Sequence, residues 1–281
     1  MSNIAKQIRE SLKENFSLDE AKAISLIICN DILGIDTIDI YTGKDIILTD
    51  RQRQDLDHII YRLKQNEPIQ YVIGYANFFG RRYKVDKNTL IPRPETTELV
   101  QLIIDTCANK KRFLDIGTGS GCIAITLAKE IDGAEVEAWD ISVGAINIAK
   151  QNSDSLDAGV KFKEIDVLSI DEKVMSDREV YDVIVSNPPY ITEDEKAEME
   201  RNVLDWEPHS ALFVAHTDPI LFYRKIAHIG THLLKKEGWI FFEINRAYGK
   251  EVTEMLKGLG YNNIELKKDT YGNDRMVYAQ L

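Results

Sequence analysis

The run Asn187-Pro188-Pro189-Tyr190 has the residue types needed to hold and activate a nitrogen atom. Asn187 and Pro188 each precede a proline, so both are restricted to extended backbone conformations, and the two prolines donate no N–H of their own. The Asn187 side-chain oxygen and the Pro188 carbonyl oxygen are therefore hydrogen-bond acceptors on a stiff support. We expect Asn187, Pro188 and Tyr190 to be catalytic, and the whole run, with Pro189, to bind the substrate.

The chemistry that these acceptors favour is group transfer to an amide or aromatic amino nitrogen. Such a nitrogen is a poor nucleophile because its lone pair is delocalised. Two acceptors that take both of its hydrogens favour the tetrahedral character that develops in the transition state. Tyr190 can pack against the flat group that carries the nitrogen. We also expect the Asn187 amide N–H₂ to donate to a backbone carbonyl or to the Tyr190 region, which keeps the Asn187 oxygen aimed at the target.

A glycine-rich loop, Gly117-Thr118-Gly119-Ser120-Gly121, predicts a cofactor site. Glycines adopt positive φ and let a ligand approach the backbone closely. The helix expected after the loop offers free N–H groups and the positive end of its dipole to a carboxylate, which suits the amino-acid part of S-adenosylmethionine. Asp140, at the end of the second predicted strand, can accept both hydroxyls of a ribose. We expect the cofactor to be bound by Gly117, Thr118, Gly119, Ser120, Gly121, Asp140, Asp166, Val167 and Asn187.

Asp166, with Val167 beside it, follows the third predicted strand and has two interpretations of equal weight. Its carboxylate can reach the amino group of an adenine, or it caps its own loop. The residues alone leave both open.

The glycine loop with Asp140 does not by itself separate S-adenosylmethionine from a nicotinamide dinucleotide. The dinucleotide pattern requires Gly or Ala at its sixth position, and Cys122 fills that place here. The chain also lacks a recognisable acid/base pair for hydride transfer. The decision rests on the Asn187 run, which lies at the carboxyl end of the fourth predicted strand, where ligands of open α/β sheets bind.

The elements that position these residues alternate between strand and helix from about residue 95, which predicts an open α/β sheet. Ser142 caps the helix after the second strand, and Asp218 caps a later helix with Pro219 at its first position. The last two strands form an antiparallel hairpin around a turn at 271–274. Together this is a Rossmann-like, mostly parallel sheet of seven strands, at 112–116, 136–140, 160–165, 181–186, 239–244, 263–267 and 275–280.

Residues 1–65 read as a small helical bundle, because two capping boxes each precede an apolar helical repeat. Ser17 pairs with Glu20 in the first box, and Thr49 pairs with Gln52 in the second. Residues 66–94 are expected to be a linker that contains a β-hairpin. Its strands lie near Phe78 and Tyr83, around a polar turn at 86–88. The remaining residues, 95–281, form the catalytic domain.

The formal net charge of -11 argues against a nucleic-acid substrate, since binding to a phosphate backbone is driven by contacts from lysine and arginine. A local basic patch could compensate, but we favour solvated surfaces for its candidates. These are Arg51, Arg53, Arg81, Arg82 and Lys84.

The three cysteines and five histidines show no metal-binding spacing, so we predict no metal site. Sparse, unpaired cysteines are typical of reduced thiols. The N-terminal residues lack the pattern of a targeting peptide, and no apolar stretch is long enough to span a bilayer. We expect a cytoplasmic protein, acting as a monomer.

Six runs spread over nearly the whole chain carry a resemblance to one family. They are Glu67–Gly74, Phe79-Gly80, Leu90–Thr96, Asp115–Gly121, Asn187–Tyr190 and Glu207–Phe213. With these runs the chain resembles the HemK/PrmC family, the glutamine methyltransferases of peptide chain release factors. Asn187–Tyr190 alone is shared with DNA adenine methyltransferases, whereas the Ile91–Thr96 run, Ile-Pro-Arg-Pro-Glu-Thr, is far more specific.

The resemblance implies a class I S-adenosylmethionine-dependent methyltransferase preceded by a helical substrate-recognition domain. It also implies that the methyl group passes by direct in-line displacement to the glutamine side-chain amide nitrogen of the Gly-Gly-Gln motif in release factors, which leaves S-adenosylhomocysteine. Gly117–Gly121, Asp140, Val167 and Asn187 would line the cofactor, and Asn187–Tyr190 would hold the glutamine.

The chain departs from the family pattern at three places. Thr97 stands where the family usually has Glu, with Glu98 next; Val214–Pro219 replaces a glycine-rich turn; and Asn245 follows Glu243-Ile244 where the family often has Gly.

Three other functions are alternatives. A DNA or RNA adenine N6-methyltransferase would need a basic cleft and a segment that reads and extrudes a base. A protein that binds S-adenosylmethionine without catalysis need not keep an intact Asn187 run. A nicotinamide-dependent oxidoreductase is disfavoured by Cys122.

Overall fold

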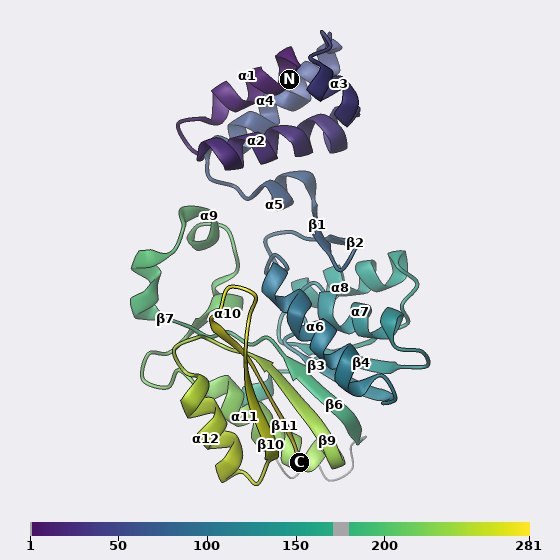
Figure 1. Ribbon diagram of the computed structural model, residues 1–281, viewed down its shortest axis with the longest axis vertical. Coiled ribbons are helices and arrows are strands. Elements are labelled where there is room, and N and C mark those ends of the chain that lie inside the picture. Colours follow the sequence, from purple (N-terminus) through teal and green to yellow (C-terminus); the bar gives the residue numbers. More distant parts are fainter. Residues whose placement is uncertain (1, 171–179) are drawn as a thin grey trace. The chain divides into compact units, whose positions relative to one another are not determined.

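The computed structural model describes residues 2–170 and 180–281, which divide into two compact units. Unit 1 comprises Met1–Gly74 and Glu200–Trp206, and unit 2 comprises Tyr75–Met199 and Glu207–Leu281 (Figure 1). None of the helices in this described part of the chain combines the length and the apolar character that crossing a membrane requires.

Unit 1 is helical, and its helices bury one continuous apolar cluster that includes Ile8, Leu12 and Leu56. Both predicted capping boxes are confirmed: Ser17 and Glu20 exchange hydrogen bonds at one helix start, and Thr49 and Gln52 do so at another. The helices are α1 (Asn3–Leu12), α2 (Leu18–Ile27), the π-helical turn η1 (Ile28–Ile32), α3 (Thr37–Thr42), α4 (Asp50–Lys64), α5 (Ile69–Ile73) and α9 (Arg201–Leu204).

A β-hairpin opens unit 2, and its turn differs from the one predicted. Strand β1 (Tyr75–Phe78) pairs antiparallel with β2 (Arg81–Lys84), so the turn lies at Phe79-Gly80 and the expected turn at 86–88 is wrong. Phe79 and Gly80 have φ of 47° and 72°, the positive values that a tight two-residue hairpin turn requires. The polar residues 86–88 instead form a turn after the hairpin, in which Asp86 accepts from the Asn88 backbone N–H at 2.9 Å.

The core of unit 2 is a seven-stranded sheet in the order β10-β11-β9-β6-β3-β4-β5, which confirms the predicted fold class. Only β11 runs antiparallel to its neighbours, in the C-terminal hairpin with β10. The strands are β3 (Arg112–Ile116), β4 (Glu135–Asp140), β5 (Lys161–Glu164), β6 (Tyr181–Ser186), β9 (Leu234–Glu243), β10 (Asn262–Lys268) and β11 (Asp274–Gln280). A separate short pair joins β7 (Ile191–Thr192) to β8 (Phe213–Val214).

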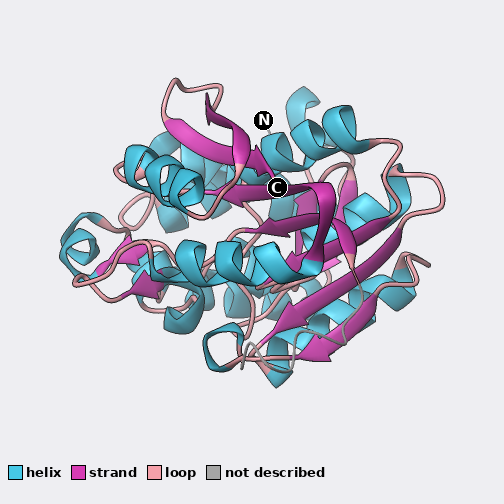
Figure 2. Cartoon of the chain, turned by 90° about the horizontal axis from the view of Figure 1, so that it is seen from below, coloured by secondary structure: helices cyan, strands magenta, loops and turns pink. Residues whose placement is uncertain are grey.

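Helices cover both faces of this sheet (Figure 2). The helices of unit 2 are α6 (Pro94–Cys107), α7 (Cys122–Glu130), α8 (Val143–Ser155), η2 (Val167–Ser169), η4 (Glu193–Glu198), α10 (His209–Leu212), α11 (Leu221–Leu233) and α12 (Gly249–Gly258). Successive strand residues point to opposite faces, so Val183 and Val185 join the cluster under α6 and α7, whereas Ile184 joins the cluster under α11 and α12.

One of the two predicted caps in unit 2 is confirmed and the other is wrong. The Ser142 hydroxyl accepts from the Ala145 N–H at the start of α8. Helix α11 begins at Leu221 without a side-chain cap. The Asp218 carboxylate is instead held by the Arg224 guanidinium, with both of its oxygens at 2.7 Å. This bidentate, charge-assisted pair engages both oxygens of the carboxylate.

We expect Gly230→Ala to lower the free energy of unfolding by about 1–3 kcal/mol, the usual cost of overpacking. Its Cβ would lie 2.3 Å from the Tyr261 hydroxyl oxygen. Tyr261 is buried and donates to the Ala227 carbonyl at 2.8 Å, so it has little room to move. The better helix propensity of alanine offsets only about 1 kcal/mol.

Urea unfolding measures this difference, and Gly258→Ala is the matched control. The described residues leave the space beside Gly258 open, so alanine there should raise stability by up to about 1 kcal/mol. Equal stability of the two variants would contradict the packing argument.

Candidate active site

The carboxyl ends of β3, β4, β5 and β6 surround a cavity of about 310 Å³ in unit 2. After β3 the chain adds β4 and β5 on one side, and then returns to place β6 on the other side of β3. Such a switch in strand order leaves a crevice at the carboxyl edge of the sheet, which is where open α/β sheets bind their ligands.

The predicted site residues divide into those that face this cavity and those that support it. The cavity wall includes Gly117, Gly119, Asp140, Asp166, Val167, Asn187, Pro188 and Pro189. Within the described residues, the wall does not include Thr118, Ser120, Gly121 or Tyr190.

The three loop residues behind the wall shape the glycine loop. The Thr118 hydroxyl donates to the Asp115 carboxylate at 2.7 Å, and Ser120 is buried. A Cβ on Gly121 would lie 3.2 Å from the Ala149 Cβ and 2.9 Å from the Ile125 side chain, so this glycine allows α7 and α8 to pack closely. The sequence pattern marks the loop correctly but does not show which of its residues face a ligand.

The Asp140 carboxylate is held in place before any ligand arrives. Its two oxygens accept from the Gly119 N–H at 2.8 Å and from the Ser142 N–H at 2.9 Å. Burial raises the pKa of Asp140, and these backbone bonds counteract the rise. Each carboxylate oxygen accepts more than one hydrogen bond, so Asp140 can also bind two neighbouring hydroxyls. Apolar side chains of Ile141, Val167 and Leu168 lie further along the wall and suit a flat ring.

Asp166 carries the bonds of a loop cap. One of its oxygens accepts from the Leu168 N–H at 2.9 Å, and the other accepts from the Ser169 hydroxyl at 2.5 Å. Of the two interpretations left open by the sequence, capping is the one whose hydrogen bonds are present. Asp166 nevertheless lines the cavity.

Asn187 faces the cavity with a fixed side chain, but its amide partner differs from the one predicted. Its Nδ2 donates to the Thr96 hydroxyl oxygen at 3.3 Å, whereas the sequence predicts a backbone carbonyl or the Tyr190 region as the acceptor. None of the described residues donates to its Oδ1. Thr96 lies in the first turn of α6 and reaches Asn187 because α6 packs beside the sheet.

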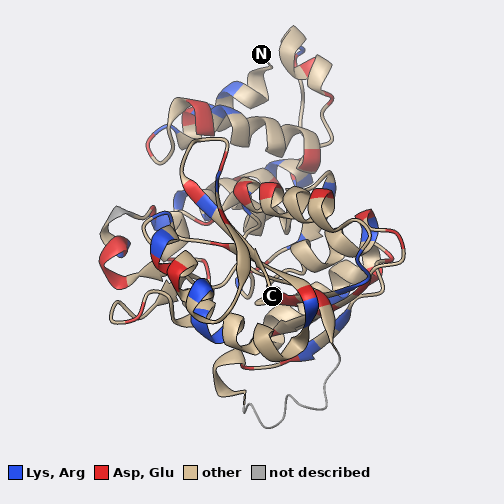
Figure 3. Ribbon diagram, turned by 60° about the horizontal axis from the view of Figure 1, so that its bottom comes forward, with Lys and Arg blue, Asp and Glu red and all other residues tan. Residues whose placement is uncertain are grey.

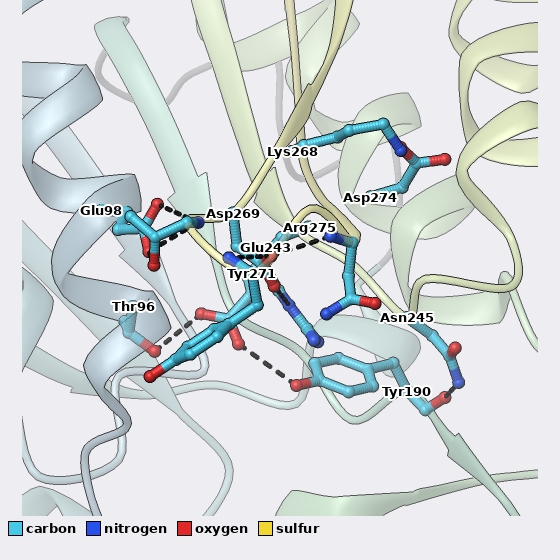
Figure 4. Close-up of polar contacts among 12 residues, drawn as sticks. Thr96, Glu98, Tyr190, Glu243, Asn245, Lys268, Asp269, Tyr271, Asp274 and Arg275 are labelled. Carbon is cyan, nitrogen blue, oxygen red and sulfur yellow. Dashed lines mark hydrogen bonds and ion pairs between the residues drawn. The ribbon is translucent and has the colours of Figure 1, made fainter.

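Tyr190 lies behind the cavity wall, whereas the sequence predicts that its ring packs against the substrate. Its hydroxyl donates to the buried Glu243 carboxylate at 3.2 Å, and its carbonyl accepts from the Asn245 Nδ2 at 3.0 Å (Figure 4). Burial and the nearby charge of Glu243 raise the pKa of Tyr190. The ring therefore supports the Asn187 run from behind.

Sequence reasoning missed Thr96, Glu243 and Glu207. Glu207 accepts from the Ile91 N–H at 3.1 Å and from the Arg93 guanidinium at 2.5 Å, which ties the extended segment before α6 to the segment that carries Pro208. Thr96 and Glu207 both lie in runs quoted for their family resemblance, which was the available signal. For Glu243 the available signals were its place in a predicted strand and its position two residues before Asn245, in one of the departures from the family pattern.

Two protein families match this chain. Residues 3–74 match the PrmC N-terminal domain, and residues 95–205 match the Methyltransferase small domain. A protein of Bacteroides thetaiotaomicron named Release factor glutamine methyltransferase is 51% identical over 99% of both chains. One of Flavobacterium psychrophilum with the same name is 40% identical over 99% of this chain and 98% of its own.

Solved structures share the fold at lower identity. The hMettl16 catalytic domain in complex with MAT2A 3'UTR hairpin 6 has a TM-score of 0.56 at 17% identity, covering 83% of this chain and 81% of that one. A methyltransferase from Pyrococcus furiosus has a TM-score of 0.53 at 18% identity, covering 78% of this chain and 96% of that one.

We expect Asp140→Ala to weaken binding of S-adenosylmethionine by about 10² or more. Two charge-assisted hydrogen bonds of about 1.5–3 kcal/mol each would be lost, and every 1.4 kcal/mol is about tenfold in affinity. The variant also leaves the Gly119 and Ser142 N–H groups without their acceptor. Calorimetry measures the affinity, and thermal unfolding checks that the fold survives. An unchanged affinity would rule out a role for Asp140 in holding the cofactor.

Proposed function

Since the chain belongs to the family of release factor glutamine methyltransferases, we propose that it methylates the glutamine side-chain amide of peptide chain release factors, within their Gly-Gly-Gln motif. The observation that carries this proposal is the 51% identity over 99% of both chains to a relative of that name. Incubating the protein with S-adenosylmethionine and a release factor, followed by mass spectrometry of the glutamine peptide, tests it. Methylation at any other residue, or none, would contradict it.

The methyl donor is S-adenosylmethionine, which supplies a methyl group bound to a positively charged sulfur. The cavity residues fit this molecule. Asp140 offers acceptors for the ribose hydroxyls, Ile141 and Val167 offer apolar walls for the adenine, and the positive φ of Gly117 and Gly119 exposes backbone beside the N-terminus of α7. Each oxygen of Asp166 can accept a second hydrogen bond, so Asp166 could also accept from the adenine amino group while it keeps its own loop bonds.

Asn187 and Pro188 would hold the glutamine. The Asn187 Oδ1 and the Pro188 carbonyl accept the two hydrogens of the target amide, which orients the nitrogen. As the nitrogen gains positive character its N–H groups become stronger donors, so both bonds strengthen toward the transition state, and this lowers the barrier. The nitrogen–methyl bond forms as the methyl–sulfur bond breaks, and the methylated nitrogen then loses one proton to water. No strong base is required, because that proton leaves after the transfer. Pro189 keeps Pro188 extended, and Tyr190 supports the run through Glu243.

A nucleic-acid substrate has less support. In Figure 3 acidic and basic residues are interspersed along the ribbons. The basic residues of β2 already have partners: Arg81 pairs with Glu130, Arg82 lies over the Tyr75 ring at 4.5 Å, and Lys84 donates to Gln151. We therefore propose a protein substrate and no direct contact with nucleic acid.

We further propose that unit 1 recognises the release factor and that the enzyme acts as a cytoplasmic monomer. The described residues that line the cavity all belong to unit 2. Unit 1 exposes the apolar side chains of Leu18, Ile47 and Tyr61, which are 73%, 91% and 64% exposed. The three cysteines are free and buried, as suits a reducing compartment.

We expect Asn187→Ala to lower kcat by about 10² or more, the usual cost of one oriented transition-state acceptor. Asn187→Asp is the sharper variant. Aspartate cannot donate to Thr96, and its charge would stabilise the positively charged donor in the ground state more than in the transition state. It should bind S-adenosylmethionine at least as well as the wild type and yet transfer the methyl group much more slowly. Single-turnover methylation at saturating cofactor measures this, and a near-normal rate would show that accepting alone suffices.

Replacing Leu18, Ile47 and Tyr61 together with serine should raise KM for an intact release factor by about tenfold or more, because interface anchors are lost. Methylation of a short peptide that contains the Gly-Gly-Gln motif should be unchanged, since the peptide needs only unit 2. An equal loss with both substrates would place recognition elsewhere.

A further inference from the structure

The carboxylate of Glu243 accepts hydrogen bonds from two hydroxyl groups that arrive from different elements (Figure 4). Thr96 donates to one of its oxygens at 2.6 Å, and Tyr190 donates to the other at 3.2 Å. Glu243 is 1% exposed and Thr96 is 2% exposed. Water therefore does not compete for these bonds.

The direction of these bonds decides which end of Asn187 faces Thr96. An ionised carboxylate only accepts, and a hydroxyl has a single hydrogen to give. Thr96 gives that hydrogen to Glu243, so toward Asn187 it can only accept. The end of the Asn187 carboxamide that faces Thr96, at 3.3 Å, must then be the N–H₂ group. The oxygen of the carboxamide is left for the cavity.

Three neighbours stabilise the ionised form that this order requires, and they oppose the effect of burial. Burial has the largest effect and raises the pKa of Glu243, whereas the Thr96 hydrogen bond, the positive charge of Arg275 and the Tyr190 hydrogen bond lower it. Arg275 is itself held by Asp269, whose carboxylate lies 3.2 Å from its Nε.

Two of the departures from the family pattern support the same arrangement. Asn245 donates to the Tyr190 carbonyl at 3.0 Å and to Glu195 at 3.0 Å, which fixes the segment that carries the Tyr190 ring. Glu98 accepts from the Thr270 hydroxyl at 2.9 Å, which fixes the turn that begins with Asp269 against α6.

We propose that Thr96 and Glu243 are positioning residues for methyl transfer, which fix the Asn187 carboxamide with its oxygen toward the substrate nitrogen. This rests on the proposed function, because it requires Asn187 to accept from the glutamine amide. A carboxamide is nearly symmetric in shape, so packing alone distinguishes its two orientations poorly. If the Asn187 carboxamide were turned over, its N–H₂ group would face the glutamine amide, whose own two N–H hydrogens need acceptors.

The test compares Thr96→Val with Thr96→Ser. Valine keeps the shape and removes the hydroxyl, whereas serine keeps the hydroxyl. We expect Thr96→Val to lower kcat by about tenfold or more, as misplacement of a reacting group does, with KM for release factor and S-adenosylmethionine affinity unchanged. Thr96→Ser should restore most of the rate.

Thr126→Val is the matched control, because Thr126 is also buried and does not line the described part of the cavity wall. Its hydroxyl forms a hydrogen bond of 2.8 Å with the Tyr83 hydroxyl. It should lose stability and keep kcat. A double variant with Asn187→Ala adds a second readout: Thr96→Val should cost nothing further once Asn187 is gone, since residues that act through one another are not additive.

The proposal is overturned if Thr96→Val keeps the wild-type kcat, if valine and serine lose activity equally, or if the Thr96 and Asn187 effects multiply. Failure of the proposed function gives a different result: the wild-type protein itself binds S-adenosylmethionine but leaves the release factor unmethylated. That result would overturn the positioning role as well.

Discussion

The burial of the Glu243 carboxylate is the constraint on which the active site depends. A charge removed from water is strongly unfavourable unless it is paired and hydrogen-bonded. Thr96 on α6, Tyr190 after β6 and Arg275 on β11 meet this need from three distant parts of the sequence. They converge because β9, which ends at Glu243, lies between β6 and β11 in the sheet. The strand order therefore brings the partners of Glu243 together at the site.

The same network explains how a protein can activate an amide without a strong base. The Asn187 oxygen and the Pro188 carbonyl are neutral acceptors, so their effect depends on correct orientation more than on charge. Pro189 restricts the backbone that carries the Pro188 carbonyl, and the hydrogen bond to Thr96 restricts the Asn187 side chain. Asp140 is fixed in the same way by the backbone N–H groups of Gly119 and Ser142. Groups held in place before the substrate arrives need little reorganisation during the reaction.

The features that the sequence predicts correctly depend on residues that lie close together in the chain. The seven strands, the Ser17–Glu20 box and the place of Asn187 at the end of β6 follow from local periodicity and short motifs. The turn at Phe79-Gly80 was misplaced because it depends on a positive φ that phenylalanine rarely adopts.

Contacts beyond the local motifs account for the remaining differences. Asp218 pairs with Arg224, six residues further along the chain, and the Tyr190 hydroxyl donates to Glu243. The bond from Thr96 to Glu243 crosses from one helix to a strand much later in the chain. No local pattern contains such a partner, so only the folded chain shows it.

The most direct measurement is a crystal structure of the protein with S-adenosylhomocysteine and a peptide that contains the Gly-Gly-Gln motif. The account predicts that the glutamine amide nitrogen lies about 3 Å from both the Asn187 Oδ1 and the Pro188 carbonyl oxygen, with the Asn187 Nδ2 still on Thr96. A glutamine amide bound away from Asn187, or an Asn187 carboxamide turned so that its oxygen accepts from Thr96, would contradict it.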